Sequence, residues 1–328
     1  MRETIQRLTE TFGPSGFEER IRAVIRDEVE DLADELQVTP LGSLVAIRRG
    51  SGGGQRIMMA AHMDEIGVMA SYIDEKGFIR LAPLGGVYSI TCIGSRVLFE
   101  NGTMGVIGLD EKRQDKKQIP SLSELYIDVG ATSKEDCPVR VGDAAVFVRT
   151  FFAQGRRLVA KAMDNRIGCA VLIETMRRLQ KTPHEIHFVF TAQEETNLSG
   201  AQTAAYGIDP DLAIAVDVTG TGDRPESRPM AVQLGQGPAI KVQDALMIAH
   251  PLVREWLVAA AERINVPYQM EVMEGGTTDA AVTQLVRAGV PSGCLSIPCR
   301  YVHSPSEMVD EEDVEGAVRV LVEALSTR

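Results

Sequence analysis

The strongest constraint on the fold is a change of pattern along the chain. Between Gly67 and about Ala160, short apolar segments of strand length alternate with Gly, Pro, Asn and Asp, and no segment has the periodicity of an ordinary helix. This pattern is typical of a small all-β barrel or sandwich. On both sides of it, apolar strands alternate with helical segments, as in a three-layer α/β sheet. We therefore predict an α/β domain of residues 1–66 and 162–328, interrupted by a β-barrel at 67–161.

Periodicity and turn signals predict the individual elements. Ser15 and Glu18 match a capping box before a helical apolar pattern that continues to Leu36. The predicted strands are 43–48, 56–63, 185–192, 212–218, 268–273 and 292–297, and the predicted helices are 166–180, 252–265, 279–288 and 311–326. The length of 328 residues exceeds what one hydrophobic core usually spans, which agrees with two domains.

Charge and cysteine content argue against several classes of function. The net charge of −12 disfavours nucleic acid and anionic membranes as partners. The one basic cluster, Glu111–Lys117, is broken by acids and predicts a solvated loop. The five cysteines show no C-x-x-C spacing, which favours a reduced, cytoplasmic compartment over a disulfide framework. No apolar stretch approaches the roughly 18 residues that a membrane span needs.

Acids and histidines stand at the ends of predicted strands. These residues are His62, Asp164, Glu194, Glu195, Asp217 and His303, and Asp64 follows His62 by two positions. Taken singly, each has a structural explanation, such as a hydrogen-bonded core histidine, a helix N-cap, a turn residue or an exposed acid. Taken together, they fall where open α/β sheets form their ligand crevice, at the carboxyl ends of the strands. We therefore expect them to share one site.

The composition of this group indicates metal ions. Four carboxylates and two imidazoles in one crevice would be strongly unfavourable unless cations neutralise them. Mixed histidine and carboxylate ligands suit zinc, cobalt or manganese. Six groups are too many for one tetrahedral zinc, but they suit two ions about 3.5–4 Å apart that share a carboxylate.

Five motifs carry a family resemblance. HMDEIG, AMDNRIG, FTAQEE, AVDV and IPCRYVHSPSEM occur in the order and approximate spacing of metallopeptidase family forty-two. The chain resembles these glutamyl- and leucyl-type aminopeptidases, which assemble into hollow tetrahedral particles, over nearly its whole length. The resemblance implies a phosphorylase/peptidase-like α/β/α catalytic domain and a PDZ-like barrel that dimerises. It also implies two zinc or cobalt ions, short peptide substrates, and dimers that join into dodecamers.

The resemblance also assigns roles to individual residues. Asp164 would bridge the two metals, Glu195 and His303 would complete one site, and His62 and Asp217 the other. Glu194 would be the general base, and Asp64 would orient His62. The segment TNLSGA replaces the VGLRGA common in relatives, so the preferred substrate side chain stays open. GGTTDA matches a family segment with one extra Thr, and we expect its loop role to be unaltered. Lys241 and Arg300 are basic residues that could favour acidic substrates from beside the pocket, with a role elsewhere in the fold as the alternative.

Three other functions remain as alternatives. A metal-dependent deacylase of N-acyl substrates could use the same metal pair. A glycoside hydrolase needs a carboxylate pair in a groove lined with aromatics, whereas aromatics make up 5% of this chain and its one Trp, Trp256, falls in a predicted helix. A non-catalytic assembly protein would be expected to lack a ligand or the base, and none is missing here.

Overall fold

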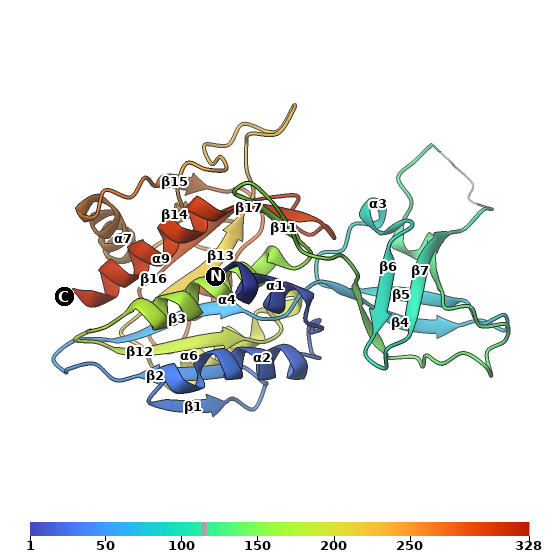
Figure 1. Cartoon of the computed structure of the whole chain (residues 1–328), viewed down its shortest axis with the longest axis horizontal. Coiled ribbons are helices and arrows are strands. Elements are labelled where there is room, and N and C mark those ends of the chain that lie inside the picture. Colours follow the sequence, from blue (N-terminus) through green and yellow to red (C-terminus); the bar gives the residue numbers. More distant parts are fainter. Residues whose placement is uncertain (113–116, 328) are drawn as a thin grey trace.

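The computed structural model describes residues 1–112 and 117–327. A large sheet flanked by helices and a smaller barrel make up the molecule (Figure 1). Part of the predicted basic loop, residues 113–116, lies outside the described residues. Within the ranges that the structure describes, no helix combines the length and the apolar character that a membrane crossing requires. All five cysteines are free thiols, as the absence of a disulfide pattern predicted.

The large sheet has 11 strands. Four central strands are neighbours in the order β12 (Glu185–Thr191), β3 (Arg56–His62), β13 (Leu212–Thr219) and β16 (Ser292–Arg300), and adjacent pairs among them are parallel. The other strands are β1 (Glu35–Val38), β2 (Leu44–Arg48), β10 (Phe152–Gln154), β11 (Arg157–Ala160), β14 (Ala239–Gln243), β15 (Gln269–Val272) and β17 (Glu307–Asp310). The carboxyl ends of the central strands therefore lie along one edge, where open α/β sheets hold ligands.

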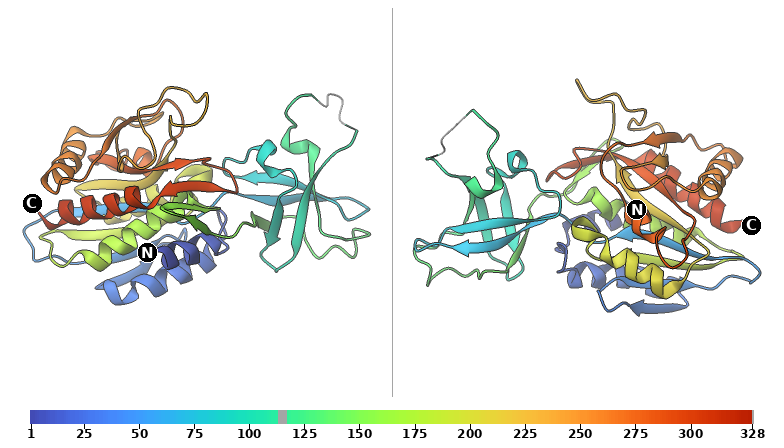
Figure 2. Two further views of the ribbon diagram at one scale, coloured as in Figure 1. Left: turned by 45° about the horizontal axis from the view of Figure 1, so that its top comes forward. Right: turned by 180° about the vertical axis from the view of Figure 1, so that it is seen from behind.

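Helices cover both faces of this sheet. The first face packs against α1 (Arg2–Glu10), α2 (Glu19–Val29), α4 (Met163–Arg178), α7 (Pro251–Arg263) and α9 (Glu311–Ser326). The other face packs against α6 (Ser199–Ile208) and α8 (Asp279–Thr283), and the view from behind brings α6, in yellow, to the front (Figure 2). Alternate residues of β3 enter the two cores, Met59 on one side and Met58 on the other. Burial on both faces explains why these strands are continuous apolar runs.

The barrel closes through six strands in the order β4-β5-β8-β7-β6-β9. Their bounds are β4 (Gly67–Ile73), β5 (Ile79–Leu84), β6 (Arg96–Phe99), β7 (Met104–Leu109), β8 (Leu125–Asp128) and β9 (Ala144–Phe147), with α3 (Ser89–Cys92) between β5 and β6. A separate hydrophobic core fills it. The barrel strands end at Phe147, because the next two strands belong to the large sheet, where β11 pairs with β17 and β10 pairs with β11. The domain limits at 66/67 and 161/162 and the PDZ-like character of the barrel stay predictions.

The structure corrects several predicted elements. The predicted helix 166–180 begins at Met163, and the predicted helix 279–288 ends already at Thr283. The helix α6 was not predicted. The capping box was wrong, because neither side chain caps α2: Ser15 donates its hydroxyl to Asp64, and Glu18 accepts from the backbone N–H groups of Gly16 and Gln193. Both side chains therefore bind residues that follow the sheet strands β3 and β12, and neither binds the start of the helix.

A buried ion cluster joins the N-terminal segment to the loops after β3 and β11. Glu65 accepts from Lys161 at 2.5 Å and from Arg166 at 3.3 Å. The Arg166 side chain is 0% exposed and also donates to the carbonyl oxygens of Leu8 and Gly13. A buried charge is tolerated only when such partners are present.

Arg166→Ala should destabilise the fold strongly, because it leaves Glu65 buried with a single cation and removes donors from the buried carbonyls. We expect a loss of about 3–5 kcal/mol in the free energy of unfolding, measured by urea denaturation. The control is Arg178→Ala, which breaks an ion pair with Glu315 whose two side chains are each 37% exposed. It also removes a 3.6 Å contact with Glu174, but Glu174 keeps its partner Arg177, so the cost should be about 1 kcal/mol or less. Equal losses in the two variants would contradict the importance of the buried cluster.

Candidate metal centre

All of the predicted site residues lie at one edge of the sheet. His62 ends β3, Asp164 lies in the first turn of α4, Asp217 lies near the end of β13, and His303 follows β16. Glu194 and Glu195 begin the short helix α5 (Glu194–Asn197), directly after β12. The parallel order of the strands explains the convergence, since residues far apart in sequence reach the same edge.

His62 stands among three carboxylates. Its Nε2 lies 3.0 Å from Asp164 Oδ1, 3.7 Å from Asp217 Oδ1 and 3.8 Å from Glu194 Oε2. Its Nδ1 lies 3.2 Å from the backbone oxygen of Asp64. The two ring nitrogens therefore face different surroundings, one the carboxylate cluster and the other the Asp64 segment.

His303 completes the cluster from the other side. Its Nε2 lies 3.3 Å from both Asp164 Oδ2 and Glu195 Oε2. Asp164 thus presents one oxygen to each imidazole. Two sets of potential ligand atoms lie within 4.8 Å of one another: His62 with Asp164 and Glu195, and His62 with Glu194 and Asp217. This grouping differs from the expected one, because His62 belongs to both sets and Glu194 belongs to one of them.

Asp64 connects the segment after β3 to the start of α5. Its carboxylate accepts from the backbone N–H groups of Glu194 at 3.0 Å and Glu195 at 3.1 Å, and from the Ser15 hydroxyl. Burial opposes its charge, but the contact with His62 and these donors outweigh that effect and lower the pKa of Asp64. Asp64 therefore fixes the start of α5 relative to His62.

The close grouping of buried carboxylates shifts the pKa values of the site. Burial, together with neighbouring acids, raises the pKa of Glu194 and of Asp217 well above their usual values, and raises the pKa of Glu195 to about 8. Burial disfavours the charged imidazole of His303, but Asp164 and Glu195 outweigh it and raise its pKa to about 10. Protein groups alone leave this cluster short of positive charge, and cations would supply it.

The residues present fit divalent metal ions. The donor set mixes imidazole nitrogen with carboxylate oxygen, which suits zinc and its neighbours in the first transition row. Oε1 of Glu195 is buried and has no hydrogen-bond partner. A buried, unpaired carboxylate oxygen is costly unless something positive meets it. Both observations favour a metal centre.

Sequence reasoning missed several contributors to the site. Glu307, 1% exposed, accepts from the backbone N–H groups of Asp164 at 2.9 Å and His303 at 2.8 Å. Gly85 and Gly86, which follow β5, lie against the cluster. A Cβ at Gly86 would lie 2.2 Å from His303 Nδ1, and Gly85 has a φ of +77°, in the left-handed region. The Gly-Gly pair in PLGGV was the available signal, although by itself it indicates only a turn.

A pocket with a volume of about 660 Å³ opens beside the cluster. Its lining includes both imidazoles and all four carboxylates of the site. Lys241 and Arg300 do not line it: Lys241 pairs with Glu271 and Arg300 with Asp223. Their alternative role, elsewhere in the fold, is the one the structure gives them.

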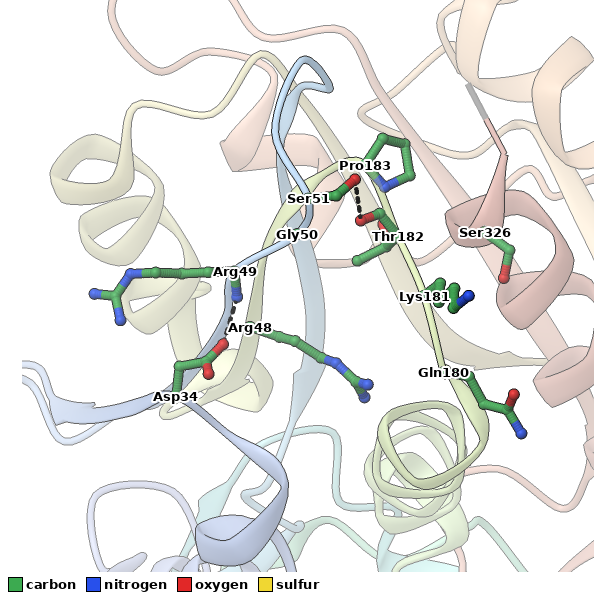
Figure 3. A pocket seen from close by; sticks show the side chains of 10 residues that line it. All are labelled: Asp34, Arg48, Arg49, Gly50, Ser51, Gln180, Lys181, Thr182, Pro183 and Ser326. Carbon is green, nitrogen blue, oxygen red and sulfur yellow. Dashed lines mark hydrogen bonds between the residues drawn. The ribbon is translucent and has the colours of Figure 1, made fainter.

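Another hollow, of about 630 Å³, lies at the opposite edge of the sheet, where β2 ends beside the start of β12 (Figure 3). Its basic side chains do not converge, because Arg48 and Arg49 point in different directions and the Arg49 N–H donates to Asp34 (Figure 3). Arg48 also donates to the Met176 carbonyl. This hollow lacks the clustered acids and imidazoles of the first pocket.

Comparison with known proteins identifies the family. The model of the M42 glutamyl aminopeptidases matches residues 42–320. The chain belongs to this family. A relative from Acetivibrio thermocellus, named as a candidate aminopeptidase, is 50% identical over 327 residues, which cover 99% of this chain and 98% of the relative. The family expected from the motifs is therefore confirmed, and it is a family of peptide-bond hydrolases.

Solved structures of aminopeptidases share the whole fold. An aminopeptidase of the archaeon Desulfurococcus kamchatkensis has a TM-score of 0.94 and 42% identity, with 99% of this chain and 94% of that chain covered. The TET1 peptidase of Pyrococcus horikoshii, described as assembling into a tetrahedron or a large octahedral shell, has a TM-score of 0.90 and 33% identity, with 100% and 99% covered. The coverage means that the barrel and the sheet are both part of the likeness.

Glu307 should be important for holding the centre of this M42 chain. Glu307→Ala leaves the N–H groups of Asp164 and His303 without their acceptor, and each buried, unsatisfied group costs about 1–3 kcal/mol. We expect a corresponding loss in the free energy of unfolding by urea, with Glu307→Gln intermediate because one acceptor oxygen remains. Glu312→Ala, which removes a 67% exposed carboxylate paired with Arg156, is the control. A loss no greater than that of the control would show that these two hydrogen bonds contribute little.

Proposed function

We propose that the chain is a dinuclear metal-dependent aminopeptidase that removes N-terminal residues from short peptides. The observation that carries this proposal is the position of Asp164, with one carboxylate oxygen toward His62 and the other toward His303. A carboxylate that faces two imidazoles through separate oxygens suits a bridging ligand between two ions. Membership of the M42 family supports the same reading.

In this proposal, the two ions are zinc or cobalt. Asp164 would be the ligand shared between them, Glu195 and His303 would help to hold one ion, and His62 and Asp217 would help to hold the other. When bound, such ions polarise a peptide carbonyl and bring the pKa of a water toward neutrality. Asp64 orients His62 and, through the N–H groups of Glu194 and Glu195, fixes the glutamates on the other side of the cluster.

Glu194 is the proposed general base. Its carboxylate reaches into the pocket, and its Oε2 lies 3.8 Å from His62 Nε2. It would take a proton from the attacking water and return it to the leaving amine, as one residue acting as base and then acid can do. Glu194 also belongs to one of the two sets of potential ligand atoms, with His62 and Asp217, and in this proposal it stays free of the metals. The remaining negative charge of the edge would attract the free ammonium group of a substrate N-terminus, which accounts for action at that end.

Glu194→Gln should keep both metals and lose catalysis, because the amide is a neutral isostere that cannot accept the proton. We expect turnover to fall by at least about a thousandfold, within the range for a lost general base, while the metal content measured by elemental analysis stays at that of the wild type. Asp164→Asn serves as the contrasting variant and should lose metal as well as activity. A Glu194→Gln protein with a near-normal rate would refute the base assignment, and one depleted of metal would make Glu194 a ligand.

A deacylase would use the same side chains, and the free amino group separates the two functions. Dialysis against a chelator should abolish release of p-nitroaniline from aminoacyl-p-nitroanilides, and added zinc or cobalt should restore it. The N-acetylated forms of the same substrates should stay inert throughout, because they lack the ammonium group that the edge attracts. Metal-restored cleavage of the acetylated forms alone would favour the deacylase.

The family also supports a proposal about the assembly and the location of the protein. We propose a homo-oligomer in the cytoplasm, either a dimer or a dodecamer built from such dimers. Each subunit would have a catalytic domain of residues 1–66 and 162–328, and the barrel of residues 67–161 would join two subunits into the dimer. The shells described for the TET1 peptidase of Pyrococcus horikoshii support this proposal. The net charge of −12 supports the absence of nucleic-acid and membrane partners.

A further inference from the structure

The pocket beside the proposed metal centre has two chemically different parts. Its inner end holds the acids and imidazoles of the site. Its walls are apolar or neutral, and they include Tyr88, Leu198, Val218, Met273, Thr277 and Val302. Within the described lining, every carboxylate belongs to the centre itself, and no lysine or arginine is present. A substrate side chain that lies along these walls therefore meets no fixed charge of either sign.

The nearest candidates for a charged wall are engaged elsewhere. Lys241 is 0% exposed and forms an ion pair with Glu271. The Thr219 hydroxyl also donates to Glu271, at 2.8 Å, so this acid has a cation and a donor already. Arg300 donates to Asp223 at 2.6 Å. Neither basic side chain would reach the pocket without giving up a buried or part-buried partner.

We infer that this pocket selects peptides whose N-terminal side chain is uncharged and apolar, such as that of leucine or methionine, over those that begin with glutamate or lysine. The inference deepens the proposed function and rests on it. Transferring a charged side chain into a site without a partner is costly, whereas an apolar side chain gains from burial against the walls. The carboxylates of the inner end do not compensate a substrate lysine side chain, because the proposed ions and the substrate's own N-terminal ammonium group already occupy them. The inferred preference of this chain therefore differs from the glutamyl preference that gives the family model its name.

Met273 is the wall residue best placed to set this preference. Its side chain is unbranched and half-buried, and its sulfur accepts only a weak contact from Thr219 Oγ1 at 3.8 Å. A Cβ at the neighbouring Gly276 would lie 3.2 Å from Met273 Cε, so the glycine leaves room for the thioether. A Cβ at Gly275 would meet no atom within 4 Å, which leaves open space along the same wall. A flexible thioether beside free space adapts to apolar side chains of different shape.

The first experiment compares kcat/KM for the p-nitroanilides of leucine, methionine, glutamate and lysine with the metal-loaded wild-type enzyme. We expect leucine and methionine to exceed glutamate and lysine by about 100-fold or more, the scale at which a mismatched pocket discriminates. A preference for glutamate or lysine would overturn the inference and leave the proposed function standing. Release from no substrate in the panel would overturn the proposed function, and the inference with it.

The second experiment places a charge on the wall. Met273→Lys should raise the ratio of kcat/KM for glutamate over leucine by about tenfold or more, because the new ammonium group pairs with the substrate carboxylate. The matched control is Met270→Lys, the same substitution three residues earlier at a position that is 39% exposed and outside the lining, and it should leave the ratio unchanged. An unchanged ratio in Met273→Lys, with the thermal unfolding midpoint and metal content of the wild type, would overturn the role of Met273. An equal change in both variants would do the same, since it would reflect overall charge.

Discussion

Four carboxylates at one buried edge are the constraint on which the rest of the structure depends. Burial first, and then repulsion from neighbouring acids, favours protonation and raises the pKa of Glu194, Glu195 and Asp217. Of these four carboxylates, Asp164 lies between the two imidazoles and has its pKa lowered, because burial is outweighed by its contacts with His303 and His62. Such an arrangement is stable only if cations meet it and if the backbone holds each carboxylate in place.

The fold meets the second requirement with acids that do not belong to the cluster. Asp64 accepts the N–H groups at the start of α5, Glu307 accepts those of Asp164 and His303, and Glu18 accepts that of Gln193. Each of these side chains ties two separate segments of the chain to each other. Burial raises the pKa of Glu18 to about 7, although its backbone donors oppose the shift. These three supporting acids therefore fix the backbone that carries the carboxylates of the cluster.

The supporting acids explain which parts of the site the sequence could predict. The strand-end acids and histidines were found because parallel strands bring their carboxyl ends together, and the apolar runs that mark these strands are long and continuous. Glu307 and Gly86 were not found, because their partners lie in other segments and a lone acid or a glycine pair has many ordinary uses. The capping box at Ser15 and Glu18 was wrong for the same reason: the local pattern fits a helix start, but Asp64 and Gln193, distant in sequence, compete for those side chains. The early end of α8 and the unpredicted α6 reflect tertiary packing that local periodicity does not contain.

The inserted barrel takes part in the site rather than standing apart from it. The chain leaves β5 through Gly85 and Gly86, whose backbone lies against Glu195 and His303 so closely that neither position has room for a side chain. Tyr88, two residues later, lines the pocket, and its ring centroid lies 6.3 Å from that of His303. Because these contacts belong to the segment between β5 and α3, the position of the barrel and the shape of the pocket are coupled through a few residues. The return of the chain strengthens this coupling, since β10 and β11 rejoin the large sheet beside β17, the strand that begins with Glu307. A loop within the barrel and the return of the chain to the large sheet thus both lie beside residues of the proposed metal centre.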